Sequence, residues 1–302
     1  MARRRPNPRD GPVRVRWVST RASTPAHSLG LAAALVSVVK GVTVTNFVCV
    51  GVLISCASAF RSTWSPCGLS MMSTITPLAE AGRGRRYSWS AAWFIVGSVV
   101  GGATLGAVAG LLSILVRAAT LPTEPRLGAV AVLAALAGLC DARVLGPRLP
   151  HHRRQVNEQW LDQFRSWVYG AGFGAQIGCG VSTYVMTTGV YLVVAIGALS
   201  ASPALAVGLG ALFGASRGLA ILSTSRVRSM QQLSGVHRWF ETHEAHSRWL
   251  MVAVLGLSAI MLLIQLDQRV AVVVGTTSAA IGLFRSARGI RSRTTRELIG
   301  AK

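Results

Sequence analysis

Long apolar stretches without a charged residue most constrain what this chain can fold into. Residues 90–116 and 168–202 contain no Asp, Glu, Lys or Arg, and each exceeds the ~20 residues that a helix needs to cross a membrane. Only 14% of the 302 residues are charged, whereas soluble domains carry about a quarter. In lipid a helix satisfies its own backbone hydrogen bonds, so these stretches predict an all-α, polytopic bundle of membrane helices.

Six core spans can be placed along the chain in two sets of three. We expect them at residues 42–78, 90–116 and 127–146, and then at 168–202, 203–222 and 249–266. The first range is too long for one crossing and short for two, so it predicts either one broken helix or a tight pair of short helices, with breaks at Pro66 and Pro77. A second crossing there and a short apolar stretch at residues 270–284 would give up to eight crossings.

The spans divide the chain into five segments. We expect a basic disordered tail with a short apolar segment at residues 1–41, a first membrane repeat at 42–146, a basic amphipathic linker at 147–167, a second membrane repeat at 168–266, and a short apolar segment with a basic tail at 267–302.

Two short patterns recur and indicate an internal repeat. Cys67-Gly68-Leu69-Ser70 returns as Cys179-Gly180-Val181-Ser182 at an offset of 112 positions. Glycines four residues apart also occur in both halves at an offset of 108, at Gly102, Gly106 and Gly110 and again at Gly210, Gly214 and Gly218. Such spacing leaves one helix face without side chains, so these six glycines are predicted to pack against a neighbouring helix.

The charge of the chain is strongly positive and lies mostly between the apolar runs. The formal net charge is +21, and the segments 83–86, 143–165 and 226–248 hold most of the arginines between spans. Arginine-rich loops face the cytoplasm and anionic lipid, so we expect these loops inside a plasma or inner membrane that the chain crosses several times. Nucleic-acid binding is not expected, because the basic residues punctuate apolar runs instead of clustering on a polar helix.

The two cysteine patches resemble a known family. Ser65-Pro66-Cys67-Gly68-Leu69, followed by Pro77, and the glycine-rich stretch 172–180 around Cys179 are similar to the two cysteine-bearing helices in the membrane domain shared by DsbD and CcdA, proteins of thiol:disulfide interchange and cytochrome c biogenesis. The resemblance implies two inverted three-helix repeats. It also implies a broken helix and one cysteine of a redox pair, Cys67 or Cys179, in each half, with helix-break or cavity residues at Pro66, Gly68, Pro77, Gly178 and Gly180.

The function that this resemblance implies is a relay of reducing equivalents. Cys67 and Cys179 would pass them by thiol-disulfide exchange, as a thiol-disulfide oxidoreductase, from a cytoplasmic to an extracytoplasmic thioredoxin-like protein, with no bound cofactor. The alternatives are a small-solute exporter of related architecture, in which the thiols have no redox role, and an assembly protein without turnover. Cys49, Cys56 and Cys140 are expected to be small buried hydrophobes, and no cysteine spacing predicts a metal site.

Several charged or ionisable residues are expected to be structural. Arg217 lies near the basic end of its span, where it would reach toward the headgroups. Lys40 and Arg61 are expected to mark span ends. The cluster from His237 to His246 is expected to form a solvated helix of the second basic loop, and its spacing is not that of a metal-binding helix.

Overall fold

The computed structural model describes residues 45–145 and 163–266, and within these ranges the chain is helical and contains no strand. The predicted all-α class is confirmed. Among the described residues, five helices are long and apolar enough to cross a membrane, at Thr45–Ser62, Tyr87–Ala118, Thr123–Asp141, Pro203–Thr224 and Met230–Leu266. The tails at 1–41 and 267–302, most of the linker at 147–167, and the apolar stretch at 270–284 lie outside the described residues.

The first helix, Thr45–Ser62, is followed by two short helices instead of a second crossing. These are α2 (Pro66–Thr74) and α3 (Pro77–Gly82), and each begins with the proline that was predicted to break the run. Proline at the first helical position has no N–H to leave unpaired. Side chains of Ser65 and Thr76 cap the two starts by accepting from the backbone N–H of Gly68 and Ala79.

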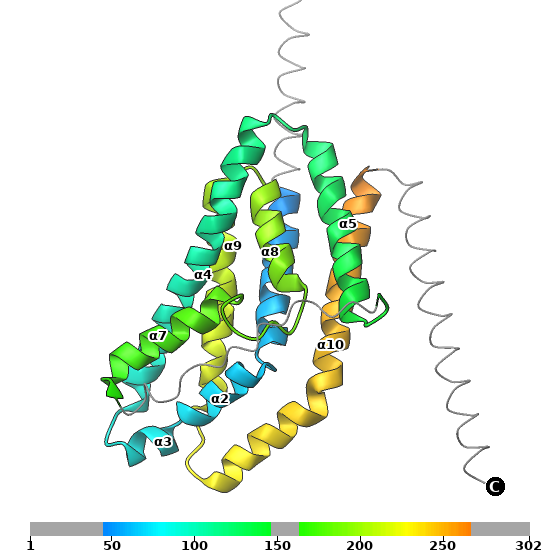
Figure 1. Cartoon of the computed structure of the whole chain (residues 1–302). Helices are drawn as coiled ribbons and strands as arrows, with labels where there is room; N and C mark the ends of the chain where they lie inside the picture. The colour runs from blue at the N-terminus through cyan, green and yellow to red at the C-terminus, as the bar shows by residue number, and fades with distance from the viewer. Residues whose placement is uncertain (1–44, 146–162, 267–302) are drawn as a thin grey trace, which may run out of the picture. The chain divides into compact units, whose positions relative to one another are not determined.

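The remaining helices complete two sets of three spans (Figure 1). The first set continues with α4 (Tyr87–Ala118) and α5 (Thr123–Asp141). The second set starts with a span broken into α7 (Ser166–Cys179) and α8 (Gly189–Leu199), followed by α9 (Pro203–Leu219) with a 3-10 turn η1 (Ala220–Thr224), and by α10 (Met230–Leu266). The second basic loop is therefore largely helical, because α10 begins well before the apolar stretch at residue 249.

The two sets run in opposite directions. In α4 and α9, Gly106 contacts Ala206 while Gly102 contacts Gly210, so the residue numbers rise in opposite senses. Ser98 contacts Gly214, and Ala206 contacts Gly106. At the 108-residue offset Ala206 is the equivalent of Ser98 and Gly106 is the equivalent of Gly214, so the two contacts are equivalent. This self-matching pattern is that of an inverted repeat whose axis passes between α4 and α9.

The other equivalent helices agree with this arrangement. Gly138 of α5 lies against Leu255 of α10, and Gly128 near the start of α5 faces Leu266 at the end of α10, so these helices are antiparallel. The first helix and α8 are antiparallel as well, since Gly51 faces Ile196 and Ser58 lies beside Gly189.

Glycine allows α4 to approach two neighbours at backbone distance. A Cβ added at Gly102, Gly106, Gly210 or Gly214 would come within 3.0 Å of the backbone of the facing helix. Gly110 makes ordinary contact with Pro203, and Gly218 faces the Ser98 side chain. On its other side α4 meets α7, where Gly174 and Gly178 lie against the backbone of Phe94 and Ser98. Lipid is as apolar as the side chains of the helices, so helices associate in it through close packing, which small residues at such crossings allow.

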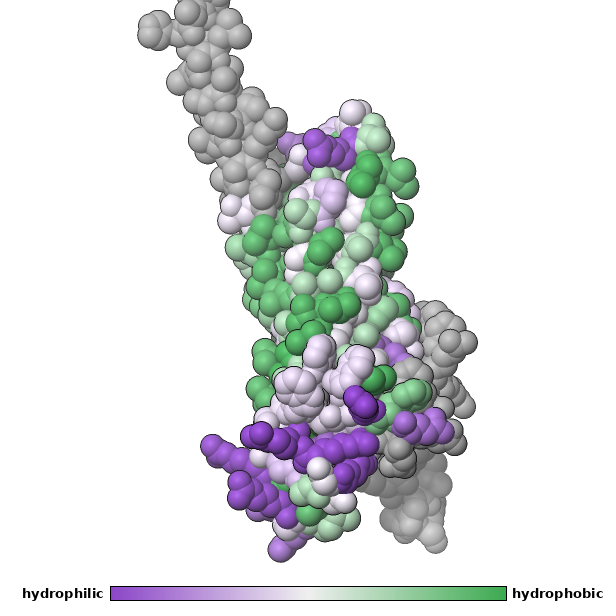
Figure 2. Space-filling model, turned by 90° about the vertical axis from the view of Figure 1, so that its left-hand side faces the viewer, coloured by the Kyte–Doolittle hydropathy of each residue, from purple (hydrophilic) through white to green (hydrophobic). Residues whose placement is uncertain are grey.

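The outer surface matches a membrane environment. Large apolar side chains of α4 point outward, among them Val100, Leu111 and Leu115, which are 54%, 67% and 65% exposed. Figure 2 shows hydrophobic residues covering most of this side, with hydrophilic residues gathered mainly at the lower end, where α3 and the start of α4 lie. The chain is therefore a membrane protein.

Two ionisable groups at the basic end make contacts that the sequence did not indicate. Arg61 lies at the end of the first helix, as expected, but it is only 3% exposed, and it donates to Glu244 at 2.6 Å and to the Ser247 hydroxyl at 2.8 Å, which ties the first helix to α10. His237 shares a hydrogen bond of 2.8 Å with Ser73 of α2. The cluster from His237 to His246 is thus helical, as expected, but part of it packs against the bundle. Among the described residues, no group of His, Cys, Asp or Glu could hold a metal ion.

Candidate functional site

The two interruptions of the helices meet at Arg217. This residue lies in the last turn of α9, where the apolar face of the helix turns inward, and it is 2% exposed. It does not reach toward the headgroups, so the expectation from its position near a span end is wrong. A buried arginine inside a membrane bundle is costly unless its donors are satisfied, and such residues mark functional positions more often than ordinary core does.

The guanidinium is held by carbonyl oxygens from two helix ends. Its Nη1 donates to the carbonyl of Ile177 near the end of α7 at 2.7 Å, and its Nη2 donates to the carbonyl of Ser62, the last residue of the first helix, at 3.4 Å. Carbonyl groups of a final helical turn have no partner within the helix and carry the negative end of its dipole. Arg217 therefore supplies positive charge where two helices stop inside the bundle.

A third bond reaches the start of α2. Nη2 of Arg217 donates to the hydroxyl of Ser65 at 3.2 Å, and the same hydroxyl accepts from the backbone N–H of Gly68 at 3.1 Å. Ser65 thus caps α2 and holds Arg217 at once. A single side chain of α9 joins the break between the first helix and α2 to the break between α7 and α8.

Both cysteines of the repeated pattern lie near this guanidinium. Cys67 is the second residue of α2 and is 2% exposed, whereas Cys179 is the last residue of α7 and is partly exposed. Cys67 follows Ser65 by two residues and Cys179 follows Ile177 by two, and both Ser65 and Ile177 accept a hydrogen bond from Arg217. No disulfide joins any of the five cysteines. The cysteines are not placed alike, because Cys67 follows its break and Cys179 precedes its own.

The predicted helix-break residues surround the same region, apart from Pro77, which starts α3. Gly180 follows α7 with a φ of 72°, a left-handed conformation in which a side chain would be strained. Gly68 lies in the first turn of α2, where a Cβ would come within 3.0 Å of the carbonyl oxygen of Thr63. Gly178 lets α7 touch the backbone of α4 at Ser98.

A small cavity lies beside Arg217. Its volume is about 10 Å³, close to the least that holds one water molecule. Of the described residues that line it, Arg217 alone is charged, and the rest are mainly apolar, including Met71, Phe94, Ile177 and Ile221.

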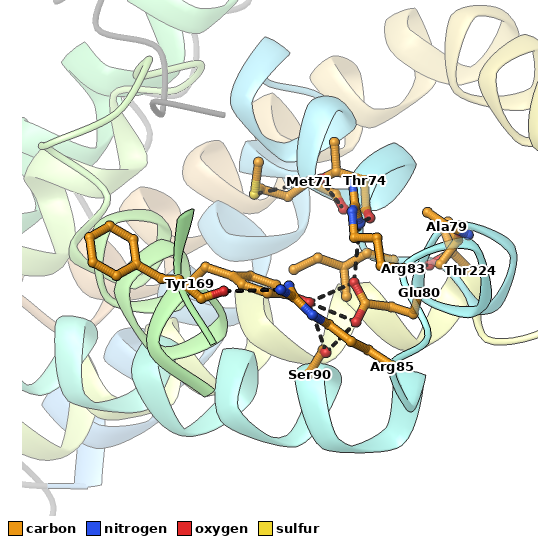
Figure 3. A network of polar contacts seen from close by, with 12 residues as sticks. Met71, Thr74, Ala79, Glu80, Arg83, Arg85, Ser90, Tyr169 and Thr224 are labelled. Atoms are coloured by element: carbon orange, nitrogen blue, oxygen red, sulfur yellow. Dashed lines mark hydrogen bonds and ion pairs between the residues drawn. The ribbon is translucent and has the colours of Figure 1, made fainter. Parts of the chain in front are cut away.

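A second buried polar cluster, which the sequence did not reveal, centres on Glu80. Its side chain is fully buried and accepts from the hydroxyl of Tyr169 at 2.7 and 2.6 Å, from the hydroxyl of Ser90 at 2.6 Å and from the guanidinium of Arg83 at 3.2 Å. Figure 3 shows these groups converging on the carboxylate, and Arg85 lies over the ring of Tyr169, 5.3 Å from its centre. The cluster ties α3 to α4 and α7 at the basic end.

A third polar contact holds the start of α8. The carboxylate of Asp141, at the end of α5, accepts from the backbone N–H of Thr188 at 2.9 Å and from the hydroxyl of Thr188 at 2.8 Å. The hydroxyl of Thr187 also donates to it. A carboxylate at a helix N-terminus complements the helix dipole, so Asp141 stabilises the broken span where α8 begins.

The comparisons with known proteins point to one kind of relative. The chain is 31% identical over 170 residues to a protein of Paracoccus versutus, 29% identical over 218 residues to one of Methylophilus methylotrophus, and 28% identical over 216 residues to one of Methylobacillus flagellatus. Each is named methylamine utilization protein MauF. No protein-family model matches the chain, and no solved structure does.

The extent of these matches differs between the relatives. They cover 55%, 71% and 70% of this chain in the same order. The chain spans 61% of the length of the Paracoccus versutus protein, and 75% and 76% of the other two. A match of more than 210 residues is too long to lie in the two ends alone, so it runs through the helical bundle.

These relatives correct the family and function that the cysteine patches implied. The resemblance to DsbD and CcdA is wrong as an assignment, because relatives matched over most of the chain carry a different name. The relay by thiol-disulfide exchange between Cys67 and Cys179 and the link to cytochrome c biogenesis are therefore wrong as well. The exporter alternative finds no support in these relatives, and the thioredoxin-like partners were predicted only as a consequence of the relay.

Proposed function

We propose that this chain is a multi-pass protein of a bacterial cell membrane that works in methylamine utilization, in the role of the MauF proteins. The observation that carries this proposal is the similarity of 28–31% to proteins of that name from several bacteria, two of which are matched over 75% or more of their length.

We further propose that the interrupted centre around Arg217 is the working part of the molecule. Helix breaks inside a membrane bundle leave backbone groups that must be satisfied, and they persist mainly where they line a site. The four groups Ser62, Ser65, Ile177 and Arg217 come from four different segments. A change at this centre would therefore alter how both halves are held together.

The proposed orientation places the arginine-rich end in the cytoplasm. Arg83, Arg85 and Arg86 lie between α3 and α4, and Arg226 and Arg228 lie between η1 and α10, at the same end of the bundle (Figure 1). Positive residues are retained on the cytoplasmic side of membrane proteins, where anionic lipids attract them at about 1 kcal/mol per residue. Anionic lipid is accordingly the partner that we propose for this surface.

The proposed function is tested by complementation. A strain of Methylophilus methylotrophus that lacks its own MauF would be given this chain on a plasmid and grown with methylamine as the sole nitrogen source, and with ammonium as the control. Growth on methylamine that equals at least about half of the rate restored by the native gene supports the proposal. No growth on methylamine, with the chain present in the membrane and normal growth on ammonium, contradicts it.

A further inference from the structure

The charge of Arg217 is not balanced by any acid in the described part of the chain. All three hydrogen-bond partners of its guanidinium, two carbonyls and one hydroxyl, are neutral. The ion pairs of Arg61 with Glu244 and of Arg83 with Glu80, both within the described residues, do not involve Arg217. An uncompensated charge in a medium of low dielectric constant is expensive, so a negative group is expected near it.

One donor of the same guanidinium is also without a partner. The Nε of Arg217 is buried and forms no hydrogen bond, although arginine can donate five. Buried donors are almost always paired, and an exception calls for a ligand, an ion or a water as its explanation. Because Arg217 lines the cavity described above, an occupant can reach this side chain.

A second unpartnered group lies on a residue that Arg217 already contacts. The hydroxyl of Ser62 is buried and unpaired, whereas its carbonyl accepts from Nη2 of Arg217. Some serines bond back to their own helix, as Ser113 does to Gly110, but Ser55 and Ser58 on the same helix as Ser62 are also buried and unpaired. Ser62 does not line the cavity, so an occupant of the cavity is expected to meet the Arg217 side chain and not this hydroxyl.

We propose that the cavity beside Arg217 binds one small monovalent anion, of the size and chemistry of a halide. One positive charge matches one negative charge, and the volume of about 10 Å³ admits a single particle of about the size of water. The apolar lining around Met71 and Ile177 could not replace the hydration of a divalent anion such as sulfate. A water molecule alone would satisfy the Nε but would leave the charge unbalanced. This inference does not depend on the proposed role in methylamine utilization.

The test measures thermal unfolding of the purified full chain in detergent at constant ionic strength. Sodium chloride or bromide is titrated against sodium gluconate, whose anion is too large for the cavity, and against sodium sulfate. The proposal predicts a saturable rise of Tm with chloride and with bromide, and no such rise with gluconate or sulfate. Equal behaviour in all four salts would overturn it.

Variants separate binding from the structural role of Arg217. Arg217→Met is expected to raise the half-saturating chloride concentration at least about tenfold, because a hydrogen bond to a charged group is lost. Arg117→Met, at an exposed arginine near the end of α4, is the matched control and should leave the chloride response unchanged. A chloride response of normal strength in Arg217→Met would overturn the proposal.

A variant that leaves Arg217 in place guards against misfolding. Ala220 lines the cavity and makes none of the three bonds to Arg217. Ala220→Leu should fill the cavity and abolish the chloride response while the Arg217 contacts persist. An undiminished response in Ala220→Leu would place the anion elsewhere and overturn the assignment of this cavity.

Discussion

Single buried charges set the local structure where the first helix, α2 and α7 are interrupted and where α3 meets α4. Arg217 joins two helix breaks, and Glu80 joins α3 to the bundle through three donors from three different segments. The carboxylate of Glu80 is surrounded by donors, and removing it would leave those buried donors without an acceptor. Substitutions at such positions should therefore cost more than substitutions at exposed charges.

Glu80→Gln is predicted to destabilise the protein. A glutamine keeps the shape, but it loses the charge opposite Arg83, and its NH2 group would face the hydroxyl donors of Tyr169 and Ser90. We expect a loss of about 2–3 kcal/mol, measured as a lower midpoint in thermal or denaturant unfolding in detergent. Glu124→Gln is the matched control, because Glu124 is exposed, and it should change the midpoint by less than about 0.5 kcal/mol. Equal effects of the two substitutions would refute the account of this cluster.

Individual site residues were predicted from the sequence less well than the fold. The apolar runs predicted the spans because membrane helices must satisfy their backbone within the helix, and Pro66 and Pro77 begin helices where breaks were expected. Arg217 was expected at the headgroups, because a position in the sequence does not tell which face of the helix a side chain occupies. Its place in the last turn of α9, three residues after Gly214, was the signal that could have placed it on the packed face.

The cysteine match misled because it was short. Four residues around Cys67 and four around Cys179 suggested a redox pair, and the sequence indicated neither Glu80 nor the bonds of Arg217 to Ser65 and Ile177, two residues before each cysteine. A pattern of Cys, Gly, an apolar residue and Ser also suits a helix break that needs a close backbone approach, as at Gly68, and a left-handed residue, as at Gly180. The similarity over more than 200 residues therefore outweighs it.

At the scale of helices, close backbone contact between α4 and α9 is what holds the two halves together. Lipid offers little hydrophobic driving force for helix association, so contact area and packing must supply it. Gly102, Gly106, Gly210 and Gly214 form this contact, and the repeat of their spacing at 108 residues is what made it visible in the sequence.

Gly210→Val is predicted to separate α4 from α9. Any side chain there would overlap the backbone of Gly102 and Gly106, which cannot move without displacing α4. We expect loss of the folded, monodisperse protein in gel filtration, or a fall in Tm of more than about 10 °C.

Gly208→Val supplies the control on the same helix, since nothing lies within 4 Å of a Cβ at Gly208. This variant should fold like the native chain, because the added side chain meets no neighbour. The two substitutions change helix propensity equally, so a difference between them reports the contact with α4. Normal folding of Gly210→Val would contradict the close crossing of α4 and α9.

At the scale of the whole molecule, the two oppositely oriented halves place all arginine-rich loops of the described bundle at one end. Successive spans cross in alternating directions, so every second connection between spans lies on the same side. The arginine-rich loops are such alternate connections. The distribution of arginines and the inverted repeat are independent observations, and they agree on which connections share a side.

Labelling of single cysteines in intact cells tests this orientation. In a chain whose five cysteines are replaced, a cysteine at Ser234 lies at the arginine-rich end and one at Thr123 lies at the other. A maleimide that does not cross membranes should label the cysteine at position 123 in intact cells, and the cysteine at 234 only after the cells are opened. The reverse pattern would contradict the cytoplasmic placement of the basic end.

The growth of the strain without MauF, on methylamine, is the most direct measurement of the central claim that this bundle serves methylamine utilization through the centre at Arg217. The account predicts growth with the native chain and with Arg117→Met, and at least about tenfold slower growth with Arg217→Met at equal abundance in the membrane. Growth of Arg217→Met at the native rate, or failure of the native chain to restore growth, would contradict it.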